Sequence, residues 1–506
     1  MSPAPDISRA HFDVFCLMKR IFLCALLLAA PLVVFLPATR AQNAPAPFKP
    51  APLLSPSQVT LRVLPNGVRG LVKAGSSSDL VNIQVWVRAG SRFEGERESG
   101  AAHLVEILAL RGSKNYPSGA RGDDDGGARG ALRALGGDGG ALTSRDSTFY
   151  SATVASPYAP QAMKILADAV LRPDFSARAV EDAKSQAADD IARRAFDPVS
   201  SASDLAYAAA FSKHPYRRAA IGSDAAVANL SVATVKNYYA RNYVGANISV
   251  VVAGQIAPAT AHKLIAANFG AASAAKPVAP KFAPDAPFKR DTIARRRPVS
   301  REVINLAWRS PGITNPDDVV ALDALLALWR EGLDANLRRI LLRDGENGPL
   351  APLVESYDVD FLTQRDAGLF IISLVDPADR EAAVTAVLGE IRRVRDQGVS
   401  TAELERAKAQ LRAQYIEQGE TLSGQAGSLG FYEMIATHRF ALEYLDRTAK
   451  LSAADLQRAA RKYLSPETFV RAEILPLPRP RPNENQSGPV ITAQWNTQLD
   501  TAEAAR

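Results

Sequence analysis

Cysteine is nearly absent from this sequence of 506 residues, and both copies, Cys16 and Cys24, lie within the first 41 residues. We expect that segment to be a leader removed on export. The chain beyond it therefore has no thiolate to act as a nucleophile or to bind zinc, and it can form no disulfide.

The absence of other sequence patterns excludes further classes of protein. No stretch after the leader is long and apolar enough to span a bilayer, and no Gly-x-Ser-x-Gly sequence marks a serine hydrolase. The glycines at 136–140 lack both the lysine of a phosphate-binding loop and the spacing of a dinucleotide site. Removing residues 1–41 lowers the net charge from +7 to +5, since four basic and two acidic residues are lost. This mild, scattered basicity predicts no nucleic-acid partner.

The N-terminal segment reads as an export signal. Lys19 and Arg20 precede an apolar run from Ile21 to Leu36, and small residues lead to a cleavage site after Ala41. We expect a signal peptide over 1–41 and a periplasmic or secreted protein. An uncleaved leader acting as a membrane anchor is the alternative.

The remaining chain has ordinary globular composition, with 47% hydrophobic and 22% charged residues, and its length predicts two or more domains. Strand-like alternation and amphipathic helical patterns occur in one order up to residue 270 and in a similar order after residue 298. The helical patterns include residues 159–171, 176–196 with Ser176 as N-cap, 317–342 and 453–463. The expected organisation is a Pro/Ala-rich tether over 42–57, an N-terminal domain over 58–270, a linker over 271–298, a C-terminal domain over 299–476 and a disordered tail over 477–506.

The helical pattern within the stretch SGAAHLVEILALRGSKNYP, residues 99–117, carries the chemistry. His103, Glu106 and Ile107 stand at i, i+3 and i+4, so they share one helix face. Zinc hydrolases with a His-x-x-Glu-His motif bind the metal through both histidines and use the glutamate as general base. Ile107 stands where the second histidine belongs, and its side chain has no lone pair to donate.

The surrounding sequence resembles the insulinase, pitrilysin and mitochondrial processing peptidase family of zinc peptidases. The matching segments are 98–117, 135–150, 214–222 and 238–254 in the first half and 368–372, 403–411 and 456–464 in the second. This resemblance covers about residues 58–476. It implies an α+β fold of two duplicated domains, each an antiparallel-rich sheet with helices on one face, closing like a clamshell around a chamber for peptides.

The resemblance also assigns site residues. The third zinc ligand of the family, a glutamate, corresponds to Asp190, which is one methylene shorter. An edge strand that lines the substrate cleft corresponds to Gly140 and Ala141, where the family has an asparagine before the alanine. We therefore expect His103 and Asp190 as vestigial metal ligands and Glu106 as a vestigial base.

These departures predict a catalytically impaired subunit that helps bind peptide substrate, with no cofactor and only a weak possibility of zinc. Its expected partner is a motif-complete peptidase subunit of the same family in a heterodimer, with a homodimer as the other arrangement. Two alternatives stay open: a residual zinc metalloendopeptidase using His103, Glu106 and Asp190, and a peptide-binding scaffold without a catalytic partner.

Overall fold

The computed structural model describes residues 56–119, 126–283, 285–330, 332, 334–342 and 351–478. The predicted signal peptide and nearly all of the predicted tether and tail lie outside these residues. Within the described residues, no helix combines the length and apolarity needed to cross a membrane.

The first half is built on a six-stranded sheet in the order β1-β2-β6-β3-β5-β4. Its ladders are antiparallel except for the parallel pair β2 and β6. The elements of this half are β1 (Val59–Val63), β2 (Arg69–Ala74), β3 (Leu80–Val87), α1 (Ala101–Arg111), α2 (Gly127–Ala134), β4 (Asp138–Thr143), β5 (Thr148–Ala155), α3 (Ala159–Leu171), α4 (Ala177–Phe196), α5 (Pro198–Ala210), α6 (Asp224–Ala228), α7 (Val232–Asn242), β6 (Ile248–Gly254) and α8 (Pro258–Phe269).

The second half repeats this plan on a five-stranded sheet in the order β7-β11-β8-β10-β9, with β7 and β11 as the parallel pair. Its elements are β7 (Asp291–Arg297), β8 (Val303–Arg309), α9 (Pro316–Arg330), α10 (Asn336–Leu341), β9 (Val354–Phe361), β10 (Leu369–Pro377), α11 (Arg380–Gln397), α12 (Thr401–Gly419), α13 (Leu422–Ile435), α14 (Arg439–Lys450), α15 (Ala453–Tyr463) and β11 (Val470–Pro476). The predicted α+β class with two duplicated halves is confirmed.

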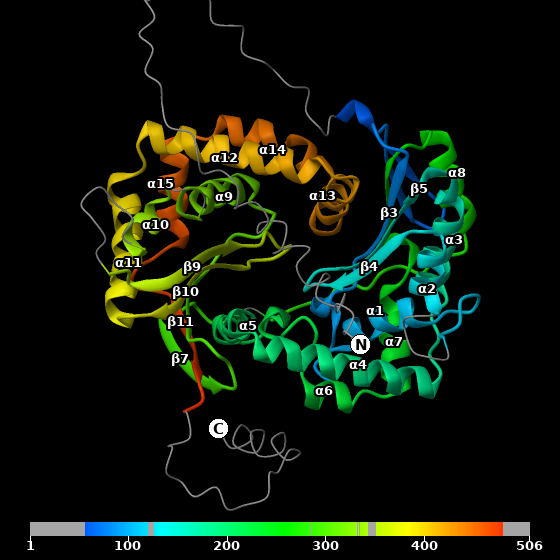
Figure 1. The fold of residues 1–506 in the computed structure, drawn as a ribbon, viewed down its shortest axis with the longest axis horizontal. Helices are drawn as coiled ribbons and strands as arrows, with labels where there is room; N and C mark the ends of the chain where they lie inside the picture. Colours follow the sequence, from blue (N-terminus) through cyan, green and yellow to red (C-terminus); the bar gives the residue numbers. More distant parts are fainter. Residues whose placement is uncertain are drawn as a thin grey trace, which may run out of the picture.

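One helix of each half packs on the sheet of the other half (Figure 1). Helix α13 belongs to the second half but packs on β3 and β6 of the first sheet, where Ala426 and Leu429 join a buried cluster with Trp86. Helix α5 belongs to the first half but packs on β8 and β11 of the second sheet. The two halves therefore hold each other through equivalent helices, since α13 follows α12 as α5 follows α4.

Two details of the second half differ from expectation. The segment 271–298 is not only a linker, because its residues 291–297 form strand β7. Most of the side chains of β7 are exposed, so the strand has no apolar alternation that a sequence pattern could reveal. The single helix predicted over 317–342 is two helices, α9 and α10, with Gly332 between them at a φ of 82°.

Candidate functional site

Helix α1 is fixed at its start by a buried carboxylate. Glu94 Oε1 accepts hydrogen bonds from the backbone N–H groups of Gly100 and Ala102 at 3.1 and 3.0 Å. Gly100 has a φ of 93°, and a side chain there would overlap Val227. The positive φ of Gly100 and the N–H groups held by Glu94 thus set the entry angle of the helix that carries His103 and Glu106.

Helix α4 supplies the third candidate residue. It begins at Ser176, whose side chain accepts from the backbone N–H of Ala179 as predicted for an N-cap. Val180, Ala183 and Ala187 form its buried stripe, and α4 contacts α1. The small alanines allow the two helices to approach closely, which brings Asp190 opposite His103.

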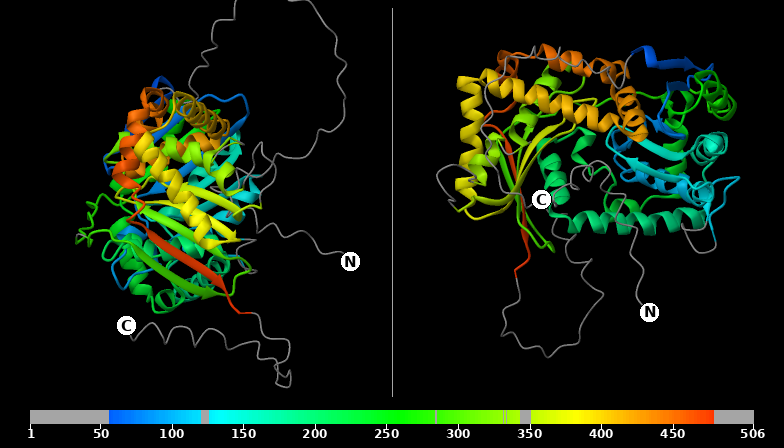
Figure 2. Two further views of the ribbon diagram at one scale, coloured as in Figure 1. Left: turned by 90° about the vertical axis from the view of Figure 1, so that its left-hand side faces the viewer. Right: turned by 45° about the horizontal axis from the view of Figure 1, so that its top comes forward.

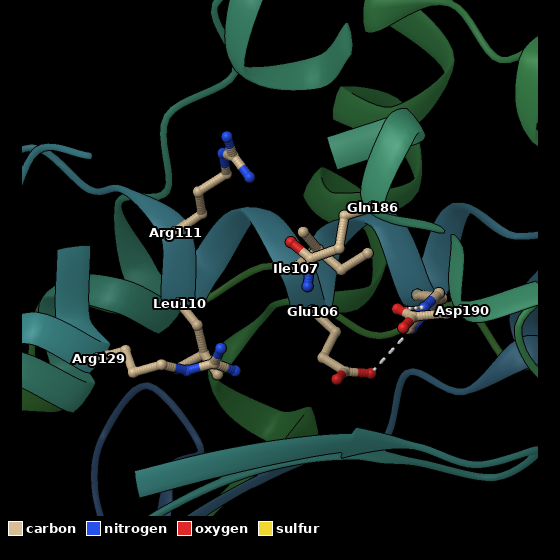
Figure 3. A pocket seen from close by; sticks show the side chains of 8 residues that line it. Glu106, Ile107, Leu110, Arg111, Arg129, Gln186 and Asp190 are labelled. Carbon is tan, nitrogen blue, oxygen red and sulfur yellow. Dashed lines mark hydrogen bonds and ion pairs between the residues drawn. The ribbon is translucent and has the colours of Figure 1, made fainter. Parts of the chain in front are cut away.

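Among the three residues predicted for the metal site, His103 lies within hydrogen-bond distance of both Glu106 and Asp190. His103 Nδ1 lies 3.2 Å from Glu106 Oε2, and His103 Nε2 lies 3.0 Å from Asp190 Oδ2. Figure 3 shows the carboxylates of Glu106 and Asp190 reaching from α1 and α4 toward the same point. The other oxygen of Asp190 accepts from Arg193 on the same helix. Every nitrogen of the imidazole is therefore engaged by an acid.

The pairing changes the charge of the imidazole. Burial opposes the protonated form of His103, which is only 7% exposed, but the hydrogen bonds to Asp190 and Glu106 outweigh it and raise the pKa to about 9. At neutral pH the ring is an imidazolium that donates from both nitrogens. An imidazolium has no lone pair for a metal ion.

Ile107 closes the other side of the site. Its side chain is 6% exposed and lines a cavity of about 40 Å³. The residues around this cavity are His103, Glu106, Ile107, Leu110, Arg111, Arg129, Gln186 and Asp190. A cavity of this size holds a water molecule or two.

Sequence reasoning missed several members of this site. Gln186 and Arg193 stand four residues before and three residues after Asp190 on α4, so helical spacing could have placed both beside it. Arg129 comes from α2, beyond the segment 120–125 that the structure does not describe, and no local pattern points to it.

These side chains do not fit a catalytic zinc ion. Such a site needs three protein donors with free lone pairs. Within the described residues, no group of three or more His, Cys, Asp or Glu side chains is arranged to hold a metal. His103 is hydrogen-bonded to both Glu106 and Asp190, Ile107 has no donor atom, and Asp190 also pairs with Arg193.

Gly140 and Ala141 lie on β4, opposite Ser151 and Tyr150 of β5. Strand β4 is the last strand of the first sheet, so its other edge is open within the sheet, and α1 contacts it. The predicted cleft residues therefore stand on an edge strand beside the helix with His103. Their role toward substrate stays a prediction.

A duplicated α+β fold and a zinc-peptidase helix that lacks one ligand define a peptidase-like protein with a degenerate metal site. Residues 71–224 match the model of the insulinase family (peptidase family M16), and residues 229–411 match the model of the peptidase M16 inactive domain. The chain belongs to the insulinase family, peptidase family M16.

Relatives agree along most of the chain. An uncharacterized zinc protease of Mycobacterium bovis is 28% identical over 428 residues, which are 83% of this chain and 93% of the relative. A probable mitochondrial-processing peptidase subunit beta of Arabidopsis thaliana is 22% identical and covers 84% of this chain and 80% of its own length. The crystal structure of a protease from Helicobacter pylori matches with a TM-score of 0.75 and 20% identity, covering 82% of this chain and 99% of that one.

Proposed function

We propose that this protein is an exported, catalytically impaired member of the insulinase family that binds peptide segments and works beside a motif-complete peptidase subunit. The observation that carries the proposal is the site itself: Ile107 fills the second ligand position, and His103 is held between Glu106 and Asp190. An ion pair stands where active members hold a metal, so this chain would neither bind zinc tightly nor activate a water.

Peptide binding is supported by the edge of β4. Strand edges bind extended peptides through main-chain hydrogen bonds, and that function does not need the metal. Gly140 carries no side chain that could block an approaching backbone. Loss of the zinc ligand and retention of the edge together favour a protein that holds peptides without cutting them.

A catalytic partner is supported by the relatives. Several similar proteins are named as subunit beta of the mitochondrial processing peptidase, which marks them as parts of an assembly. In such an assembly, one subunit can supply the chemistry while another supplies binding surface. We place this assembly in the periplasm or outside the cell, because of the predicted leader, and expect the mature chain to begin at Gln42.

One observation favours a second candidate function, a residual zinc metalloendopeptidase. His103, Glu106 and Asp190 do converge from two helices, and a metal could compete with the proton of His103 for their donors. The base in that case is Glu106. The isolated chain would then cleave peptides, and a chelator would stop the cleavage.

The deciding experiment is native purification of the tagged chain followed by peptidase and metal assays. We expect a family member with a complete His-x-x-Glu-His motif to copurify in stoichiometric amount, and the complex to cleave peptides. Replacing the motif glutamate of that partner abolishes cleavage, whereas Glu106→Gln in this chain leaves it unchanged. Chelator-sensitive cleavage by the isolated chain, restored by zinc and lost in Glu106→Gln, would falsify the proposal in favour of the metallopeptidase. If the chain binds peptides but no such partner copurifies, the result favours a peptide-binding scaffold without a catalytic partner.

A further inference from the structure

Among the residues that the structure describes, β7 is the edge strand of the second sheet at the end opposite β9. It pairs with β11 on one side and is the terminal strand in the sheet order. Figure 2, left, shows β7 as the outermost strand, below β11. This edge lies at the opposite end of the second sheet from β9 and belongs to the other half from β4, so it is separate from the site described above.

Two hydrogen bonds show which peptide groups of β7 face β11. The N–H of Asp291 donates to Phe469 O at 3.2 Å, and the N–H of Leu477 donates to Arg297 O at 3.1 Å. Residues 291, 293, 295 and 297 therefore direct their peptide groups toward β11, because these directions alternate along a strand. Thr292, Ala294 and Arg296 direct theirs outward, where they can pair with another strand.

The side chains along this edge are strongly basic. Ile293 packs toward α5, so alternation places Arg295 and Arg297 on the same face and Arg296 on the other. Arg295 and Arg296 are exposed, and within the described segments their side chains donate only to the main-chain oxygens of Ala294 and Pro476. Lys289 and Arg290 precede the strand and are exposed as well.

These cations lack acidic neighbours. Within the part of the chain that the structure describes, no carboxylate lies within 4.0 Å of Arg295, Arg296 or Arg297. Two exposed arginines elsewhere in this half do have acidic partners, since Arg301 pairs with Glu355 and Arg380 pairs with Glu302. Three arginines without an acidic partner thus follow one another on an edge strand. Among the described residues its outward peptide groups pair with no other strand, although the Ala294 oxygen accepts from Arg295.

We propose that the β7 edge binds an extended acidic peptide segment of another protein as an additional strand. Outward N–H and C=O groups of Thr292, Ala294 and Arg296 would form the ladder, and glutamate or aspartate side chains at alternate positions would face Arg295 and Arg297. Seven residues of strand give a ladder about 23 Å long, enough for a short segment.

A competing explanation makes opposite predictions. Charged side chains on an edge strand also prevent pairing with other strands. If the arginines only protect the edge, an acidic strand does not bind, and replacing them makes the protein self-associate. If they recruit a strand, an acidic peptide binds and the replacement removes that binding.

The test measures binding of a fluorescent peptide of alternating glutamate and threonine, matched to β7 in length, to the full chain by anisotropy. A lysine-threonine peptide is the charge control. The triple variant Arg295→Gln, Arg296→Gln and Arg297→Gln is compared with Lys164→Gln, Lys236→Gln and Lys276→Gln, which removes the same charge from exposed positions elsewhere. We expect roughly tenfold or greater weakening in the arginine variant alone, and weaker binding as salt is raised from about 50 to about 300 mM.

Two further comparisons separate strand addition from simple charge attraction. Ala294→Pro removes an outward N–H that the ladder with β11 does not use, so the variant folds but pairs poorly, whereas Ala294→Ser binds normally. N-methylation of alternate peptide residues likewise blocks the ladder without changing charge. Binding that survives both changes, binding of anionic vesicles or polyphosphate in place of the peptide, or no binding with self-association of the arginine variant each overturns the proposal.

Discussion

His103 Nε2 lies 3.0 Å from Asp190 Oδ2, so the histidine and the acid that would share a metal in an active relative bind each other directly. With Ile107 in place of a donor, these two groups and Glu106 satisfy one another as a hydrogen-bonded cluster between α1 and α4.

Restoring the missing donors should restore metal binding. In the double variant Ile107→His and Asp190→Glu, two imidazoles and a longer carboxylate face the same point, so we expect about one tightly bound zinc ion per chain. Metal analysis after dialysis measures it, with the native chain as the reference that retains none. The control variant Leu110→His with Asp190→Glu adds a histidine to the same cavity without the i, i+4 spacing. Equal zinc in both variants, or stoichiometric zinc in the native chain, contradicts this prediction.

The charge of His103 should make stability depend on pH. Its pKa is raised to about 9, from an ordinary value of 6.5, so the folded state holds a proton that the unfolded state releases. The stabilisation is fully present below pH 6.5 and is lost as pH rises through 9, with an upper limit of about 3 kcal/mol. Urea unfolding at pH 6 and pH 9.5 measures it. The decline should be smaller in His103→Gln, and an equal decline would show that other groups cause it.

The sequence predicted what depends on local pattern. Helix α3 and helix α15 have the predicted bounds, and the cap at Ser176 is where the pattern placed it. Helix α13 was not predicted, because small and polar residues interrupt its apolar pattern. Its Ala426 and Leu429 are buried by residues of the first sheet, which are distant in sequence. Strand β7 was not predicted because main-chain pairing with β11 holds it in the sheet, while most of its side chains are exposed and show no apolar alternation. Convergence of His103 and Asp190 followed from the family resemblance. Helical spacing along α4 could also have placed Gln186 and Arg193 beside Asp190, whereas the approach of Arg129 from α2 required the structure.

The two halves are also joined by a buried charge. Glu433, at the end of α13, is 3% exposed and pairs with Arg69 of the first half at 2.5 Å and with His438 Nδ1 at 2.8 Å. Burial opposes its ionised form, but the bonds from His438 and the charge of Arg69 hold the pKa below its ordinary value. The stabilisation is therefore present above pH 4.5 and is lost as pH falls through the lower folded-state pKa.

Replacing this carboxylate tests its contribution. We expect Glu433→Gln to lower the free energy of unfolding at pH 7 by about 2 kcal/mol, because it leaves buried donors without a charged acceptor. The difference from the native chain should shrink toward pH 3. Glu420→Gln, an exposed residue just before α13, should change stability by less than about 0.5 kcal/mol. Chemical unfolding compares the three proteins, and matching losses in the two variants would exclude a special role for Glu433.

The docking of α13 on the first sheet depends on a glycine. A Cβ atom at Gly430 would overlap the indole Nε1 of Trp86, whose N–H donates to Gln84 Oε1 at 2.8 Å. Since Trp86 is 3% exposed and stacks on Phe149, it has no open space into which it can move. We expect Gly430→Ala to lower the free energy of unfolding by about 1–3 kcal/mol, with strain outweighing the gain in helix propensity. Gly389→Ala on α11 is the matched control, because a Cβ there meets no atom within 4 Å, and it should stabilise by about 0.5–1 kcal/mol. Stabilisation by both substitutions, measured by urea unfolding, would mean that α13 does not hold the halves together through this contact.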